Sequence, residues 1–290
     1  MKKETLRENI AKLVRSGIQE IKEKQFITED LITFGSGRPN YDQVVILAGG
    51  TGVGKGFVLN NLVGIQGKVF DVDQLKSLGI RSKLIKDKVL SLTGRDITEL
   101  DLRNPYDVSF LHDVFKELQI ADKQVENLLN AMVGRENKPN LIFDVTLANL
   151  AKLEYVSNQV VEYGYSMENI HIVWIINDIE VARAQNKNRP RVVSEAMFTQ
   201  IHDQVFLSLK NILTGRFPIL DYMSGDFYIV FNQKNVDTEM SFSPMGGRYV
   251  NKTNYIKIKG KNKPMKTIDE ITQAVIDKIV LYSGTDNTPL

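Results

Sequence analysis

The stretch GGTGVGKG, residues 49–56, contains the side chain and backbone types that are best suited to binding phosphate. It follows the apolar run VVILA and precedes a helical pattern, so the glycines lie in a strand-to-helix turn. Glycine backbone folds tightly around phosphate oxygens, and a helix N-terminus adds partial positive charge. Lys55 is placed to contact the terminal phosphates of a nucleoside triphosphate. We expect the nucleotide to contact Gly50, Thr51, Gly52, Val53, Gly54, Lys55, Gly56 and Phe57.

The position after Lys55 departs from the usual phosphate-binding loop. That position normally holds a Ser or Thr whose hydroxyl reaches Mg²⁺, and here it holds Gly56, followed by Phe57. A Lys followed by Gly resembles the loop of adenylate kinases, in which a Thr comes next. Because Mg²⁺ keeps most of its waters and binds through nucleotide phosphates and a carboxylate, we expect this chain to hold the metal from outside the loop.

Carboxylates end two further apolar runs. The run VFDVD ends with Asp71 and Asp73, and LIFD ends with Asp144. Ligands of parallel α/β sheets bind outside the carboxyl ends of the strands. A phosphoryl transferase needs one carboxylate to accept the proton of the attacking hydroxyl and another to organise Mg²⁺, and we assign Asp73 to the first role and Asp144, directly or through water, to the second. The alternatives are a helix cap for Asp73 and a turn acid for Asp144, and Asp71 is assigned a supporting or capping role.

A basic segment follows the fourth apolar run. Arg183, Lys187, Arg189 and Arg191 lie within nine positions, and Pro190 interrupts the helical pattern among them. Arginines that close over phosphates stabilise the charge that develops during phosphoryl transfer and exclude water. We therefore predict a lid with catalytic contributions from Arg189, Arg191 and Arg183. A solvated basic helix face is the alternative.

Apolar runs alternate with helical patterns, which predicts an α/β fold with a largely parallel sheet. The expected strands are 44–50, 67–73, 140–146, 169–177, 226–232 and 254–260. The expected helices are 1–34, one starting near Lys55, 74–135 with a break at Asn104, 147–163, 179–213 and 267–282. We divide the chain into an N-terminal helix and loop (1–40), a core with the arginine lid (41–215) and a strand and helix extension of the same domain (216–290).

The composition is that of an ordinary globular protein, with 290 residues, of which 42% are hydrophobic and 25% charged. The 37 basic and 35 acidic residues leave a net charge of +2, which does not by itself indicate a nucleic-acid binder. The absence of cysteine excludes disulfides, thiolate zinc sites and a cysteine nucleophile. The charged N-terminus and the absence of an apolar run of ~20 residues predict no signal peptide and no membrane association. We expect a cytoplasmic protein of a bacterial or phage-infected cell.

These motifs together resemble the zeta-toxin and polynucleotide-kinase group of P-loop kinases over residues 43–210. FDVDQLK resembles the second-strand motif of this group, in a register that puts the catalytic base on Asp73. LIFDVTL is similar to the third-strand motif of polynucleotide kinases, which puts Asp144 beside the active site. ARAQNKNRPRVVSEAMF resembles their arginine lid. Gly56 departs from the Ser or Thr of the group, and neither the N-terminal helix nor the region beyond residue 216 matches it.

The resemblance implies transfer of the γ-phosphoryl group of ATP or GTP to a hydroxyl, with Mg²⁺. Members of the group act on DNA or RNA 5′-hydroxyls, on hydroxymethylated bases of phage DNA or on nucleotide sugars. We expect a polynucleotide, a modified base or a nucleotide as the acceptor, and a nucleotide sugar is the alternative. A nucleotide-binding switch that hydrolyses slowly or not at all is a second alternative, which Gly56 favours. No protein partner is evident from the sequence.

Overall fold

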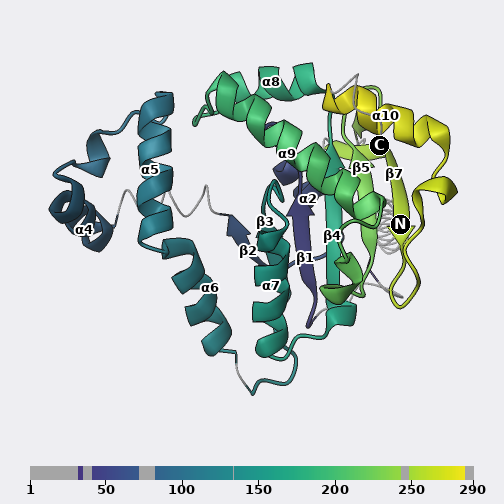
Figure 1. The fold of residues 1–290 in the computed structure, drawn as a ribbon, viewed down its shortest axis with the longest axis horizontal. Coiled ribbons are helices and arrows are strands. Elements are labelled where there is room, and N and C mark those ends of the chain that lie inside the picture. Colours follow the sequence, from purple (N-terminus) through teal and green to yellow (C-terminus); the bar gives the residue numbers. More distant parts are fainter. Residues whose placement is uncertain (1–31, 35–40, 72–81, 133, 243–247, 285–290) are drawn as a thin grey trace, which may run out of the picture.

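The computed structural model describes residues 32–34, 41–71, 82–132, 134–242 and 248–284, which form a mixed α/β fold (Figure 1). The described strands make one sheet in the order β2-β3-β1-β4-β5-β7-β6. Strands β2, β3, β1, β4 and β5 are parallel, whereas β7 runs antiparallel to both β5 and β6. The strands are β1 (Val44–Ala48), β2 (Lys68–Asp71), β3 (Leu141–Asp144), β4 (Ile170–Ile176), β5 (Phe227–Phe231), β6 (Thr238–Phe242) and β7 (Arg248–Lys259).

Helices cover both faces of the sheet and extend beyond the β2 edge. The α-helices are α2 (Lys55–Asn61), α4 (Lys83–Thr93), α5 (Pro105–Glu117), α6 (Ile120–Asn130), α7 (Ala151–Glu162), α8 (Ile179–Lys187), α9 (Glu195–Leu213) and α10 (Gln273–Ser283). Short 3-10 helices are η1 (Ile97–Glu99), η2 (Met167–Asn169), η3 (Ile219–Asp221) and η4 (Ile268–Glu270). Figure 1 shows α7 and α9 in front of the sheet and α4, α5 and α6 beyond β2.

The central strands are apolar throughout because both faces of the sheet are buried. Every residue of β1 is 0% exposed. Val44 and Ile46 belong to the core beneath α7 and α9, while Val45 and Leu47 belong to the core around α2 on the opposite face. The insertion between β2 and β3 has a small apolar cluster of its own, formed by Val89, Ile97 and Val114. The parallel sheet therefore holds the loops at its carboxyl edge on a fully packed base.

The α/β fold predicted from the sequence is confirmed, with corrections at two places. The predicted interruption of the helical segment 179–213 at Pro190 is also confirmed, because Pro190 lies in the loop between α8 and α9. The end of the predicted helix 1–34 is extended, and Ile32 forms a bridge with Val63. Strand β6 was not predicted from the sequence. The remainder of the predicted N-terminal helix lies outside the described residues.

His171 is a fully buried polar residue on β4. Its Nε2 donates to Gln43 Oε1 at 2.8 Å, and its Nδ1 accepts from the backbone N–H of Asp226 at 2.8 Å. Burial lowers the pKa of His171 well below 6.5, although the nearby carboxylate of Asp226 acts in the opposite direction. The imidazole is therefore neutral in the folded protein, with its proton on Nε2.

We expect the folded state to lose stability as the pH falls below the ordinary histidine pKa of 6.5. In that range the unfolded chain binds a proton at His171 and the folded chain does not, so each pH unit costs up to about 1.4 kcal/mol of unfolding free energy. Urea denaturation at several pH values between about 7.5 and 5 measures this slope. His171→Gln should flatten the slope, and an equally steep slope in that variant would contradict the assignment.

Candidate active site

The loop between β1 and α2 has the backbone of a phosphate-binding loop. Gly52 and Gly54 have φ values of 80° and 90°, a region that side chains with a Cβ rarely adopt. A Cβ on Gly52 would lie 2.2 Å from the carbonyl oxygen of Ala182, so the loop also packs too closely on α8 for a larger residue. Gly54 directly precedes α2, which places the loop at the helix N-terminus, where backbone N–H groups and the helix dipole favour anions.

Lys55 lies at the centre of this loop. Its Nζ donates to the carbonyl oxygens of Gly49 at 3.0 Å and Gly50 at 3.3 Å. The same ammonium lies 3.6 Å from Asp144 Oδ1, and the two side chains are only 14% and 18% exposed. A positive charge is therefore held between the loop and the end of β3, in a partly water-excluded position where electrostatic interactions are strong.

Two polar side chains hold the loop from its buried side. His202 on α9 donates from Nε2 to the carbonyl oxygen of Thr51 at 2.9 Å, and its ring lies where a Cβ on Gly50 would be 2.4 Å away. Burial lowers the pKa of His202, and the positive charge of Lys55 lowers it further, so the ring is neutral. Asn232, directly after β5, donates from Nδ2 to the carbonyl oxygen of Val53 at 2.9 Å.

The sequence did not indicate either support of the loop. His202 and Asn232 are distant from the loop in sequence, by 151 and 179 positions, and both bind backbone carbonyls. Only the fold brings them beneath the loop.

The acids at the ends of β2 and β3 lie side by side. Asp71 and Asp144 are partners in the parallel register of these strands, and Asp144 is also the partner of Leu47 on β1. Two carboxylates next to a phosphate-binding loop supply the oxygen ligands that Mg²⁺ prefers, and Mg²⁺ needs only one or two of them besides phosphates and water. The residues present therefore fit Mg²⁺. Asp73 lies outside the described residues.

One cavity of about 860 Å³ joins the loop, the acids and the arginines. Its walls include Lys55, Asp71, Asp144, Arg189 and Arg191. Val108 and His112 on α5 line the side contributed by the insertion, and Gln200 and Gln204 line the side contributed by α9. This volume is within the usual range for small-molecule sites. The cavity contains positive charge, carboxylates and uncharged amides in one place.

The loop between α8 and α9 is tied down at several points. Asn186 donates from Nδ2 to the carbonyl oxygen of Val193 at 2.8 Å and accepts from the N–H of Val193 at 3.2 Å. The N–H of Val192 donates to the carbonyl oxygen of Leu102 at 3.2 Å, so the loop also contacts the insertion. Arg189 and Arg191 lie in this tethered loop, on the cavity wall.

The structure does not bring Arg183 to the cavity, unlike the other two arginines of the predicted lid. Its Nε donates to Glu195 Oε1 at 2.6 Å, its Nη1 pairs with Glu180, and its guanidinium lies 5.3 Å from the centre of the Phe198 ring. These contacts join α8 to the start of α9. The basic segment therefore contains an arginine that holds the two helices together.

Val53 and Phe57 are not among the residues that line the cavity. Val53 is 3% exposed and belongs to the apolar core around α2, against which Phe57 packs. The unusual Phe after the Lys-Gly pair thus lies on the buried side of α2. The other predicted loop residues, Gly50, Thr51, Gly52, Gly54, Lys55 and Gly56, do line the cavity.

Gly56 has space for a side chain, since a Cβ built on it has no neighbour within 4 Å. We expect Gly56→Ser to raise the unfolding free energy by about 0.5 kcal/mol, because Ser is a better helix former than Gly. A hydroxyl at this position should also lower the Mg²⁺ concentration that half-saturates ATP binding. Gly56→Ala is the control, which should gain stability without the metal effect. Equal Mg²⁺ dependence of the two variants would contradict a metal near this position.

No protein-family model matches the chain, and no curated protein matches it. Among solved structures, the PezAT chromosomal toxin–antitoxin system of the human pathogen Streptococcus pneumoniae matches with a TM-score of 0.40 and 14% identity, over 73% of this chain and 74% of that one. The native AvrRxo1-ORF1:-ORF2 complex matches with a TM-score of 0.46 and 12% identity, over 86% of this chain and 66% of that one. The same complex with ATP matches with a TM-score of 0.45 and 10% identity, over 91% and 69% of the two chains.

The sheet contains five parallel strands in the order β2-β3-β1-β4-β5, and the phosphate-binding loop joins β1 to α2. The chain has a mixed α/β fold with a phosphate-binding loop after its first central strand. The mixed α/β fold with a largely parallel sheet, expected from the sequence, is thus present. The expectation of no protein partner is wrong, because the similar structures belong to a toxin–antitoxin system and a two-protein complex.

In the described part of the chain, no helix is both long and apolar enough to cross a membrane. The same residues contain no group of three or more His, Asp or Glu side chains arranged to hold a metal ion by themselves.

Proposed function

We propose that this protein is an ATP-dependent kinase that transfers the γ-phosphoryl group to a hydroxyl of a polynucleotide, a modified base or a nucleotide. The observation that carries the proposal is the single cavity in which Lys55, Asp144 and Arg191 meet. A phosphate-binding loop alone would suit any nucleotide binder. Carboxylates and arginines in the same cavity are what phosphoryl transfer requires in addition.

In this proposal the loop and Lys55 bind the β- and γ-phosphates, and Arg189 and Arg191 contact the oxygens of the moving phosphoryl group. The acceptor oxygen forms a bond to the γ-phosphorus while the bond to the β,γ-bridging oxygen breaks, leaving ADP. The proton of the acceptor hydroxyl passes to Asp73, which follows Asp71 by two residues. Bound Mg²⁺ would neutralise phosphate charge, and Asp144, with Asp71 beside it, would hold it directly or through water.

Two other functions remain as candidates. A nucleotide sugar would also fit an acceptor region that is lined by amides, such as those of Gln200 and Gln204. A nucleotide-binding switch is favoured by the absence of a metal-binding hydroxyl at Gly56. The arginines on the cavity wall favour the kinase over the switch, because a protein that only binds nucleotide does not need to stabilise the transition state of phosphoryl transfer.

The test is transfer of label from γ-labelled ATP to a panel of acceptors, namely 5′-hydroxyl oligonucleotides, hydroxymethyl-base DNA, nucleosides and UDP-sugars. We expect one acceptor to be labelled, and Asp73→Asn to reduce kcat for it by about 10²- to 10⁴-fold, the usual contribution of a general base. Asp87→Asn, which changes an exposed acid on α4, is the matched control and should leave kcat unchanged. Tight ATP binding without transfer to any acceptor would exclude the kinase and favour the switch.

A further inference from the structure

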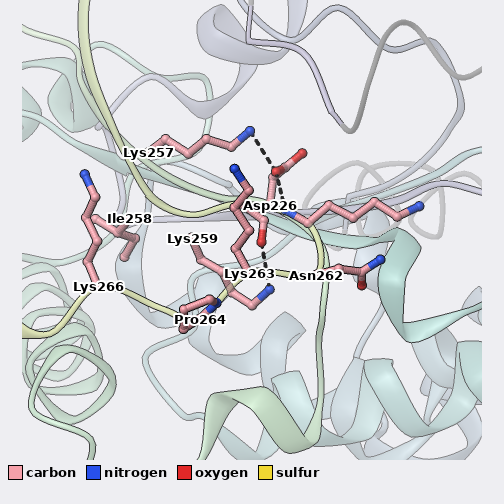
Figure 2. A pocket seen from close by; sticks show the side chains of 10 residues that line it. Asp226, Lys257, Ile258, Lys259, Asn262, Lys263, Pro264 and Lys266 are labelled. Carbon is pink, nitrogen blue, oxygen red and sulfur yellow. Dashed lines mark hydrogen bonds and ion pairs between the residues drawn. The ribbon is translucent and has the colours of Figure 1, made fainter.

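Figure 2 shows a second cavity, of about 610 Å³. It lies at the end of the sheet opposite to the phosphate-binding loop. Asp226 on its wall directly precedes β5, whereas Asn232, which contacts the loop, directly follows that strand. The five residues of β5 span about 17 Å, so the two sites are separate. The cavity walls include five lysines, Lys257, Lys259, Lys261, Lys263 and Lys266.

The segment that builds this cavity is far more basic than the chain as a whole. Residues 248–266 contain no Asp or Glu, while the whole chain has a net charge of only +2. The basic residues of the segment are Arg248, Lys252, Lys257, Lys259, Lys261, Lys263 and Lys266. A local concentration of one charge sign on a balanced chain indicates a surface that attracts the opposite charge.

Two of the lysines form the framework of the cavity. Lys259 is 3% exposed, and its Nζ donates to the carbonyl oxygens of Ser224 at 2.8 Å and Gly225 at 3.1 Å. Burial lowers its pKa, so these carbonyls are needed to stabilise its charge. Lys257 pairs with the buried Asp226 at 2.8 Å, as Figure 2 shows, and Asp226 also accepts from the backbone N–H of Lys261 at 2.8 Å. These bonds fix the end of β7 and the following turn.

Two of the remaining lysines, Lys263 and Lys266, present their charge to solvent. Lys263 and Lys266 are both exposed, and neither forms an ion pair with any carboxylate of the described residues. The Nζ atom of Lys261 forms an ion pair with Glu168 Oε2, 3.5 Å away. Asp226 is bonded to Lys257 and to the turn. The exposed lysines Lys263 and Lys266 therefore form a cationic rim at the open side of the cavity, and the bonded lysines Lys257 and Lys259 form its base.

An exposed aromatic ring lies on β7 near Lys257, one of the residues that line the cavity. Tyr255 is 44% exposed, and it precedes Lys257 by two residues on β7, which puts both on the same face of the strand. The Tyr255 ring packs against the edge of Tyr228, with 5.9 Å between centres, and Lys257 Nζ lies 4.9 Å from the centre of the Tyr228 ring. The ring is therefore held in place while much of it stays accessible.

We propose that this lysine cavity, together with Tyr255, binds the backbone and bases of single-stranded nucleic acid. A basic groove beside an aromatic ring is the combination that such strands require, since phosphates pair with the cations and a base stacks on the ring. Lys252 and Arg248 also lie on β7, but Lys252 is on the face of the strand opposite to Lys257 and pairs with Glu239 at 3.5 Å. The site is independent of the kinase assignment and would bring nucleic acid to the protein whatever its acceptor is.

The experiment is fluorescence anisotropy of the full-length protein with a labelled oligothymidylate of about 20 nucleotides, over a series of salt concentrations. Lys263→Glu/Lys266→Glu should weaken binding at least tenfold and reduce the magnitude of the salt slope by about 1.4, which is about 0.7 for each phosphate contact. Lys88→Glu/Lys116→Glu changes two exposed lysines of the insertion by the same charge and should have little effect. Tyr255→Ala should weaken binding at least fivefold, and Tyr255→Phe should restore it.

The outcomes separate this site from the phosphate-binding loop. Lys55→Ala should keep its oligonucleotide affinity, and Lys263→Glu/Lys266→Glu should keep its ATP affinity and its thermal stability. Equal losses in the two charge-reversal variants, or no binding of the oligonucleotide, would overturn the proposal. Competition by inorganic triphosphate as strong as by the oligonucleotide would assign the cavity to a small anion. Binding of polyglutamate in preference to the oligonucleotide would assign it to an acidic protein.

Discussion

Lys55→Ala is expected to reduce kcat for phosphoryl transfer by about 10³-fold, which is the upper end of what one preorganised donor contributes at a transition state. The ammonium of Lys55 lies between the carbonyl oxygens of Gly49 and Gly50 and the carboxylate of Asp144, with 14% of the side chain exposed. Its charge is thus held in a position where water screens it little. Single-turnover transfer from γ-labelled ATP measures the effect directly.

The same substitution should lower ATP affinity as well, because Lys55 contacts phosphates in the ground state too. Thermal unfolding should change little, since the side chain is on the cavity wall and the glycines keep the loop in place. Lys88→Ala, which removes one positive charge from the exposed surface of α4, is the control for net charge. Transfer by Lys55→Ala at the rate of the unmodified protein would exclude the phosphate-binding role of the loop.

The parallel core was predictable because its strands are short apolar runs that each end in polar or glycine residues. Both faces of the sheet are covered, so the run VVILA is buried at every position, and a pattern of this kind is visible in the sequence itself. Strand β6, with the sequence TEMSF, escaped prediction because it lies at the edge of the sheet and its burial is only partial. The extended residues Ile32–Phe34 continue an apolar spacing that also fits a helix, and their pairing with Val63 cannot be seen in a local pattern.

The parts of the candidate site whose functional residues are adjacent in the sequence could be predicted. The glycine loop with Lys55 forms from adjacent residues, and Asp144 follows from the rule that strand ends meet at one edge of the sheet. The supports of the loop were not predictable, because His202 and Asn232 bind backbone carbonyls that any residue could provide. The contacts of Arg183 could not be predicted for a different reason. Its positive charge is visible in the sequence, but its pairing with Glu195, 12 positions later, depends on how α8 packs on α9.

Arg191→Ala and Arg183→Ala are expected to have different consequences, although both remove an arginine from the same basic segment. Arg191 lies on the cavity wall, in a loop held by Asn186 and by the contact between Val192 and Leu102. An arginine that acts on the moving phosphoryl group contributes about 10³-fold or more to kcat, so Arg191→Ala should lose that much with little change in ATP affinity. Stopped-flow nucleotide binding and single-turnover transfer measure the two quantities separately.

Arg183→Ala should instead lower the unfolding free energy by about 1 kcal/mol, because it removes the ion pairs with Glu180 and Glu195 and the contact with the Phe198 ring. Its kcat should stay within about tenfold of the unmodified value, since the guanidinium does not reach the cavity and affects the arginine loop only through α8. Glu195→Gln, which weakens the same tie without removing an arginine, should reproduce the loss of stability. If Arg183→Ala reduced kcat as much as Arg191→Ala and Glu195→Gln did not, Arg183 would have to move into the cavity when nucleotide binds.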